Sequence, residues 1–175
     1  MNNRLYLFNT VNEEIIQEII NKIYDAIDQT PQPKEINLFI NSIGGNAWDA
    51  LALINVMDEC PIRINTICLH VAMSASAPIF ISGHKRYIAK NAIVMFHQLC
   101  VENGNVSLDE HMAQLKCWKM THQNFINLIK NKSRNGKFLT DKYIKNKMLT
   151  PTDNYFTAAQ MIELGLADAY YENKA

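Results

Sequence analysis

The sequence predicts an α/β fold in which helices cover a mainly parallel sheet. Strand-length segments rich in Ile, Leu, Val and Phe alternate along the chain with segments whose apolar residues recur every three or four positions. Apolar residues make up 48% of the 175 residues and charged residues 19%, as in a folded globular protein. The order of these segments therefore favours parallel strands joined by crossover helices, in one domain over residues 1–175.

The N-terminal half supplies most of this alternation. Residues 5–8 have the composition of a short strand, and residues 12–28 predict an amphipathic helix, because six isoleucines recur there at helical spacing. Residues 36–40 predict a second strand that ends before a pair of glycines. Residues 46–58 then predict a helix and residues 63–69 a buried strand.

The C-terminal half continues with strands at residues 86–89 and 92–96. Ser107 and Glu110 form a capping-box pattern that opens a helix over about 107–132. At 1.5 Å per residue this helix is roughly 39 Å long, so we expect part of it to project from the domain. The remaining predicted elements are helices at 140–148 and 158–164 and a strand at 168–171.

Composition and charge exclude several classes of protein. Lys+Arg and Asp+Glu each number 17, so a zero net charge gives no sign of a nucleic-acid partner. No apolar run approaches the length of a membrane span or a signal-peptide core, and we expect a cytoplasmic protein. The four cysteines have neither zinc-site spacing nor a secretory context. We therefore expect reduced thiols, no metal and no cofactor.

Two glycine- and serine-containing segments are candidates for chemistry. Gly44 and Gly45 follow a predicted strand and could turn their backbone N–H groups towards a developing anion; a turn that needs glycine only for positive φ gives the same pattern. Residues 72–77 follow the next strand. Ser74 there fits a nucleophile elbow flanked by oxyanion-hole N–H groups, although a helix N-cap serine fits as well.

A serine nucleophile needs a base that takes its proton and a carboxylate that orients the base. His97 ends the predicted strand 92–96, and the other four histidines have no comparable setting. Asp153 is the best-placed carboxylate, and Asp141 and Asp168 compete with it. A histidine at the end of a buried strand can also be an ordinary edge residue.

Taken together, these segments resemble the ClpP family, the proteolytic subunits of the Clp protease. Residues 41–45 are similar to the family's Asn-Ser-Pro-Gly-Gly turn, and residues 72–74 to its nucleophile elbow. Residues 94–98 are similar to its Val-Met-Ile-His-Gln. Residues 153–158 and 163–168 are similar to its Asp-x-aromatic-x-Ser/Thr-Ala and Glu-x-Gly-Leu-x-Asp patterns. The resemblance covers about residues 4–171.

The resemblance implies residue roles. Ser74 would be the nucleophile, His97 the general base and acid, and Asp153 the carboxylate that orients His97. The N–H groups of Gly45 and Ala75 would form the oxyanion hole.

The resemblance also implies a ClpP/crotonase-like spiral of ββα units with a projecting handle helix over about 107–132. The implied protein is a serine-type endopeptidase that acts on peptides or unfolded proteins. It would form a homo-oligomer of heptameric rings, stacked as a tetradecamer and fed by an AAA+ unfoldase.

The sequence departs from the family pattern at several positions. Ile43 and Leu99 replace prolines, and Ser76 stands where the family usually has Gly. Residues 100–104 have fewer glycines than the family's substrate-pairing strand. The chain begins almost at its first predicted strand, so the segment that meets the unfoldase is not carried over. Short, divergent relatives of this kind occur in bacteriophages, where some are prohead maturation proteases.

Two further hypotheses remain open. A catalytically weak subunit could co-assemble with a host Clp protease and modulate it, although such a subunit would not need to keep Ser74, His97 and Asp153. An acyl-CoA enzyme of the crotonase fold would share the spiral and the oxyanion hole, but it would not need these three residues.

Overall fold

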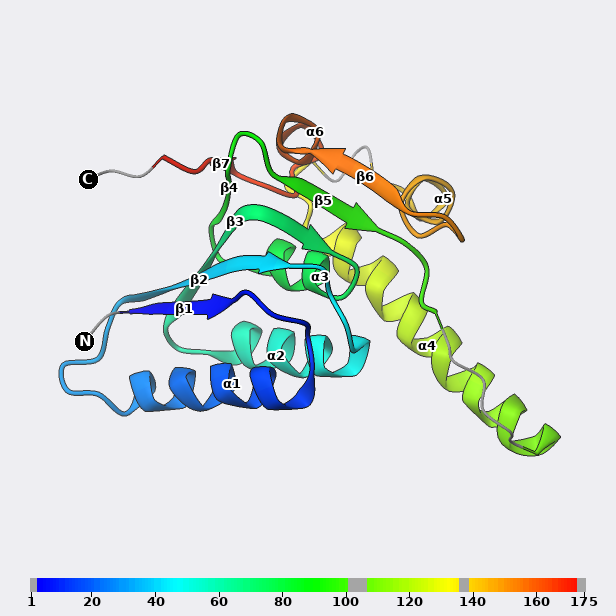
Figure 1. Cartoon of the computed structure of the whole chain (residues 1–175), viewed down its shortest axis with the longest axis horizontal. Helices are drawn as coiled ribbons and strands as arrows, with labels where there is room; N and C mark the ends of the chain where they lie inside the picture. The colour runs from blue at the N-terminus through cyan, green and yellow to red at the C-terminus, as the bar shows by residue number, and fades with distance from the viewer. Residues whose placement is uncertain (1–2, 101–106, 136–138, 173–175) are drawn as a thin grey trace.

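A seven-stranded sheet runs through the molecule, with helices packed against it (Figure 1). The computed structural model describes residues 3–100, 107–135 and 139–172. The strands are β1 (Arg4–Leu7), β2 (Glu35–Ser42), β3 (Arg63–Met73), β4 (Arg86–Ile88), β5 (Ile93–Phe96), β6 (Asn154–Thr157) and β7 (Ala169–Tyr170). The helices are α1 (Glu13–Ile27), α2 (Ala47–Glu59), α3 (Ser76–Ile81), α4 (Leu108–Lys132), α5 (Asp141–Lys147) and α6 (Ala158–Glu163).

The strand pairing explains how one long strand serves two neighbours. Strands β1-β2-β3-β4-β7 lie in that order, and each pair is parallel. Strand β4 pairs with the middle of β3, from Thr66 to Cys68, and β5 pairs with its end, from Val71 to Met73. Because β2 occupies the other edge of β3, β4 and β5 follow one another along the same edge. Strand β6 then pairs antiparallel with β5.

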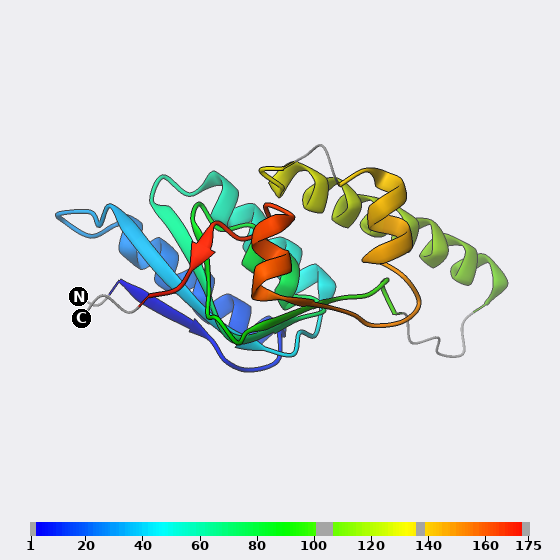
Figure 2. The ribbon, with the colours of Figure 1, turned by 90° about the horizontal axis from the view of Figure 1, so that it is seen from above.

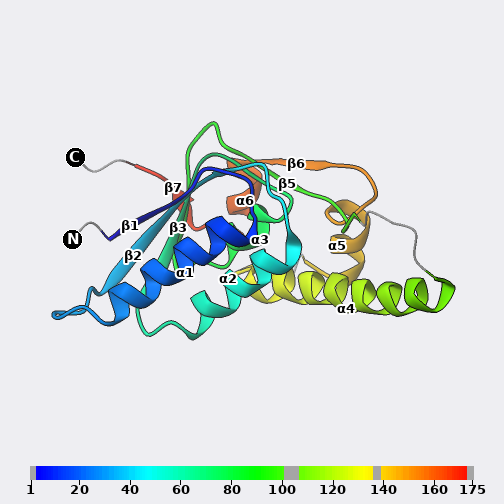
Figure 3. The same ribbon diagram turned by 60° about the horizontal axis from the view of Figure 1, so that its bottom comes forward.

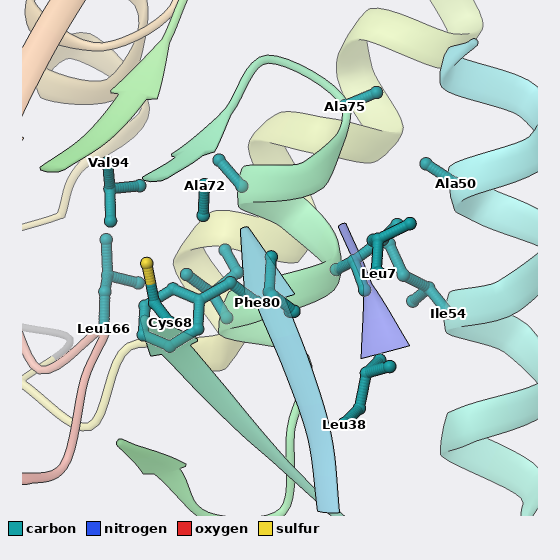
Figure 4. Packing of buried hydrophobic residues seen from close by; sticks show 14 of the residues in the cluster. Leu7, Leu38, Ala50, Ile54, Cys68, Ala72, Ala75, Phe80, Val94 and Leu166 are labelled. Atoms are coloured by element: carbon teal, nitrogen blue, oxygen red, sulfur yellow. The ribbon is translucent and has the colours of Figure 1, made fainter. Parts of the chain in front are cut away.

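Helices α1, α2 and α3 pack in sequence against the sheet, which Figure 3 shows with its lower side brought forward. Figure 4 shows the core between them, where Leu7 and Leu38 of the sheet face Ala50 and Ile54 of α2. Burying a large apolar side chain contributes about 1.5–3 kcal/mol, so these layers hold the strand ends in place.

Burial also raises the pKa of the Cys68 thiol to about 12, so this cysteine stays protonated.

The long helix α4 divides into a packed part and a projecting part. Its N-terminus is capped by Ser107, whose hydroxyl accepts the N–H of Glu110 at 3.3 Å, one of the two hydrogen bonds of the predicted capping box. Phe125, Ile126 and Ile129 are buried in the C-terminal half of α4. The other half extends away from the sheet (Figures 1 and 2) and exposes the large apolar side chains Met112, Leu115 and Met120.

The structure confirms the predicted α/β fold and its parallel sheet, with element boundaries close to those expected. Strand β6 was not predicted, because four residues after a proline-containing turn carry too short a pattern to indicate a strand. Within the described ranges, no helix is both long and apolar enough to cross a membrane. All four cysteines are free.

Candidate active site

Three neighbouring strands bring the candidate residues together at the carboxyl ends of the sheet. Strands β2, β3 and β5 are parallel, and the register aligns Ser42 with Ala72 and Met73 with Met95. The residues that follow these strands therefore emerge side by side at the carboxyl ends, where open α/β sheets bind ligands. The glycine turn at Gly44 and Gly45, Ser74 and His97 all lie at these carboxyl ends.

Ser74 occupies a strained elbow between β3 and α3. Its φ of 51° makes it the single non-glycine residue with a positive φ among the described residues. The Ser74 N–H donates to Met95 O at 2.9 Å, and Ser74 O accepts the Ala77 N–H at 3.1 Å. Because Ala75 occupies the N-cap position of α3, Ser74 is not an N-cap serine.

The elbow directs the Ser74 hydroxyl at His97. The distance from Ser74 Oγ to His97 Nε2 is 2.7 Å, and both residues are half-buried. This is hydrogen-bond distance for a hydroxyl proton donated to a neutral imidazole. That pairing is what a serine nucleophile and its base require.

The other ring nitrogen of His97 faces a cysteine that the sequence analysis did not single out. Cys100 Sγ lies 3.6 Å from His97 Nδ1 and 3.8 Å from Gln98 O. With Nε2 accepting from Ser74, Nδ1 carries the proton, and a thiol sulfur accepts it only weakly. The only sequence signal was the three-residue spacing from His97. The rest of the predicted substrate-pairing segment, residues 101–104, lies outside the described residues.

Asp153 is close to His97 in register, but its carboxylate has another partner. Its Oδ2 accepts the Tyr155 hydroxyl at 3.1 Å, and this hydrogen bond raises the pKa of Tyr155. Strand β6 pairs Asn154 with Phe96, so the register continued by one residue sets Asp153 opposite His97. The structure brings Ser74 and His97 into contact and leaves the Asp153 carboxylate on Tyr155.

The two competing aspartates are occupied elsewhere. Asp141 pairs with Lys130 at 2.8 Å, and the Lys130 hydrogen bond and charge lower the pKa of its carboxyl. Asp168 pairs with the buried Arg86 at 2.6 Å and with Arg134 at 3.1 Å. Neither has a hydrogen bond to His97 in the described part of the chain.

The glycine turn lies directly against the elbow. Gly44 has a φ of 96°, and a Cβ there would collide with Met73 O and with Ser74 Cβ. Only glycine therefore lets the two segments touch. Among the hydrogen bonds of the described residues, neither the Gly45 nor the Ala75 N–H donates to a protein group. Both N–H groups are thus available to an anion.

A cleft of about 480 Å³ opens beside these groups. Ser74 and His97 line it together with Trp48 of α2 and Trp118 of α4, whose rings stack at 4.9 Å with an interplanar angle of 10°. His122 lines it too, one helical turn after Trp118. The sequence gives this histidine no setting comparable to that of His97, and its place on the cleft wall follows from the face of α4 that carries it. Burial and the nearby charge of Lys145 lower the pKa of His122.

The comparison with known families agrees with this architecture. The fold is an α/β sheet with a projecting helix, and a serine elbow meets a histidine at the carboxyl ends of its parallel strands. The sequence model of the family described as Clp protease matches residues 1–174. The chain belongs to the Clp protease family, and this membership supports a peptidase function.

Proposed function

We propose that this protein is a serine-type endopeptidase that uses Ser74, His97 and Asp153. The observation that carries the proposal is the 2.7 Å contact between Ser74 Oγ and His97 Nε2, made from an elbow with left-handed backbone geometry. A serine that only satisfied a local hydrogen bond would not need this strain. The adjoining cleft has room for a substrate side chain next to the hydroxyl.

The chemistry follows from the positions of these groups. His97 Nε2 takes the Ser74 proton while Oγ forms a bond to the peptide carbonyl carbon, and the carbonyl oxygen becomes an oxyanion. The N–H groups of Gly45 and Ala75 stabilise that oxyanion. His97 then returns the proton to the leaving amine as the C–N bond breaks. Water, activated by His97, hydrolyses the acyl-enzyme and restores the Ser74 hydroxyl.

The carboxylate step requires a rearrangement. An imidazolium at His97 is stabilised far better by a carboxylate than by the Cys100 thiol. In this proposal the Asp153 carboxylate turns from Tyr155 to His97 Nδ1. The two residues directly follow and precede Phe96 and Asn154, the last pair of the β5–β6 register, which supports a short path for this turn. The exposed position of Asp153 leaves room for this turn.

We further propose that ring assembly drives the turn. The projecting half of α4 exposes Met112 and Met120 at 60% and 62%, which is an apolar surface suited to a second copy of the chain. Helix α4 lies between His97 and Asp153 in the chain. A contact that shifts α4 can therefore shift the segments that carry these two residues. Heptameric rings, stacked as a tetradecamer and fed by an AAA+ unfoldase, are the assembly that the family pattern suggests.

One observation favours a second candidate function. The engagement of His97 Nδ1 by Cys100, with Asp153 on Tyr155, is also the arrangement expected of a catalytically weak subunit that modulates a host Clp ring. Such a subunit would keep the fold and the cleft but would not need the Asp153 carboxylate on His97.

A fluorophosphonate probe and intact-mass measurement separate the two functions. An active serine peptidase gains one adduct, and Ser74→Ala gains none. Ser82→Ala provides a matched control, because Ser82 is a buried serine whose hydroxyl donates to Pro78 O and lies outside the cleft. Full labelling of Ser74→Ala would contradict the proposed nucleophile. No adduct on the wild-type protein, even in its largest oligomer, would favour the modulating subunit.

A further inference from the structure

One buried hydroxyl lies between the two backbone segments of the proposed oxyanion hole. Ser76 is fully buried in the first turn of α3. Its Oγ lies 2.8 Å from Ser42 O, the last carbonyl of β2, and 2.7 Å from Met73 O, the last carbonyl of β3. Its single proton is therefore shared between the ends of two neighbouring strands.

The β2 end of this connection continues into the glycine turn. Ser42 is also buried; its hydroxyl donates to Asn9 O at 2.6 Å and accepts the Gly44 N–H at 3.2 Å. Two serine hydroxyls thus join three segments: the residues after β1, the turn after β2 and the elbow after β3. Both lie in the interior, where hydrogen bonds are not exchanged with water and hold their partners more firmly.

We propose that Ser76 is a positioning residue that sets the separation between the Gly45 and Ala75 N–H groups. The inference rests on the proposed peptidase function. Gly45 comes three residues after the carbonyl of Ser42, and Ala75 comes two residues after that of Met73, so holding these carbonyls to one hydroxyl holds both donors. The glycine usual at this position in the family has no hydroxyl, and the tie is then a feature of this chain's own sequence.

Ser76→Ala and Ser76→Gly remove the tie and leave Ser74, His97 and the cleft in place. We expect kcat for a fluorogenic peptide to fall about tenfold with KM within twofold, because a displaced oxyanion donor weakens transition-state binding more than substrate binding. Affinity for a peptide boronate, whose tetrahedral adduct places an oxygen in the oxyanion hole, should weaken by a similar factor.

Ser82→Ala is the matched control. Ser82, at the C-cap of the same helix, is 5% exposed and donates to Pro78 O at 2.8 Å. We expect it to lower the unfolding midpoint about as much as Ser76→Ala but to leave kcat and boronate affinity unchanged.

The outcomes are distinguishable. An active wild type whose kcat and boronate affinity survive both Ser76 substitutions within twofold would overturn this inference and leave the peptidase function intact. A kcat that falls as much in Ser82→Ala as in Ser76→Ala would reduce Ser76 to a stability role and overturn it too. A fully assembled wild type that neither hydrolyses peptide nor binds the boronate would overturn both proposals.

Discussion

The two ring nitrogens of His97 have different surroundings. On the Nε2 side, the Ser74 hydroxyl sits at 2.7 Å on an elbow that is hydrogen-bonded to β5 and packed against Gly44. On the Nδ1 side, a thiol lies at 3.6 Å, and the candidate carboxylate is exposed and bonded to Tyr155. The Nε2 side, which meets Ser74, is built from buried strand ends. The Nδ1 side, near Cys100 and Asp153, is built from exposed residues.

This difference indicates where control of the reaction lies. Parallel register and buried hydroxyls position Ser74 against His97 within a single chain. Asp153 is exposed and is not held by buried hydrogen bonds of this kind, so its position can respond to what binds nearby. We propose that the protein keeps Ser74 and His97 in contact and adds the Asp153 carboxylate only on assembly.

The largest effect is expected on the nucleophile side. Ser74→Ala should lower kcat/KM for peptide hydrolysis by about 10⁴-fold or more, because the covalent step is lost and only oxyanion and binding effects remain. A steady-state assay with a fluorogenic peptide measures it. Turnover by Ser74→Ala within tenfold of wild type would remove Ser74 from the chemistry.

The second largest effect is expected at Asp153, on the Nδ1 side of His97. Asp153→Ala should lower kcat by roughly 10²- to 10⁴-fold in the assembled protein, because the imidazolium loses its carboxylate. The unfolding midpoint should hardly change, since Asp153 is exposed. Asp141→Ala, which removes another exposed aspartate and its pair with Lys130, serves as the control and should keep kcat.

The cleft belongs to the preformed side, and its wall can be tested separately. Trp118→Ala removes the stack with Trp48 and should raise KM about tenfold for peptides with a large apolar residue at the cleavage site. Substrates with a small residue there should lose little. Asn124→Ala, an exposed change on the packed half of the same helix and outside the cleft, serves as the control. Equal KM changes for large and small substrates would contradict a substrate-binding cleft.

The smallest effect concerns pH and stability. Burial and Lys145 lower the pKa of His122, so the unfolded chain binds its proton at a higher pH than the folded one. Stability linked to His122 is therefore lost as pH falls below the ordinary histidine value of about 6.5. His122→Gln should reduce the fall in unfolding midpoint between pH 7.5 and pH 5, and His111→Gln, outside the cleft, should not. An unchanged fall in His122→Gln would contradict this linkage.

The fold was largely predictable because its signals are local. The isoleucine spacing of α1, the Ser107 cap and the apolar runs of β2, β3 and β5 each reflect a preference that the sheet does not override. Parallel register then carries the glycine turn, Ser74 and His97 to one edge. Their meeting follows from topology and is accessible to sequence reasoning.

The partners of His97 Nδ1 could not be predicted in the same way. Whether Asp153 bonds to His97 or to Tyr155 depends on a side-chain rotation within one strand end, and a residue pattern does not encode it. Cys100 contacts Nδ1 from the irregular segment that follows β5. The position of His122 and Trp118 on the cleft wall depends on how α4 packs against α3 and α5, which a helical period alone leaves undetermined.

In this proposal the contact between Ser74 and His97 is preformed, and assembly recruits the Asp153 carboxylate. The direct measurement is kcat/KM for one fluorogenic peptide, for wild type and Asp153→Ala, across protein concentrations that span the oligomers seen by sedimentation velocity. The account predicts that wild-type activity per subunit rises with assembly while Asp153→Ala stays low throughout. Asp153→Ala rising in parallel with wild type to the same final rate would contradict it.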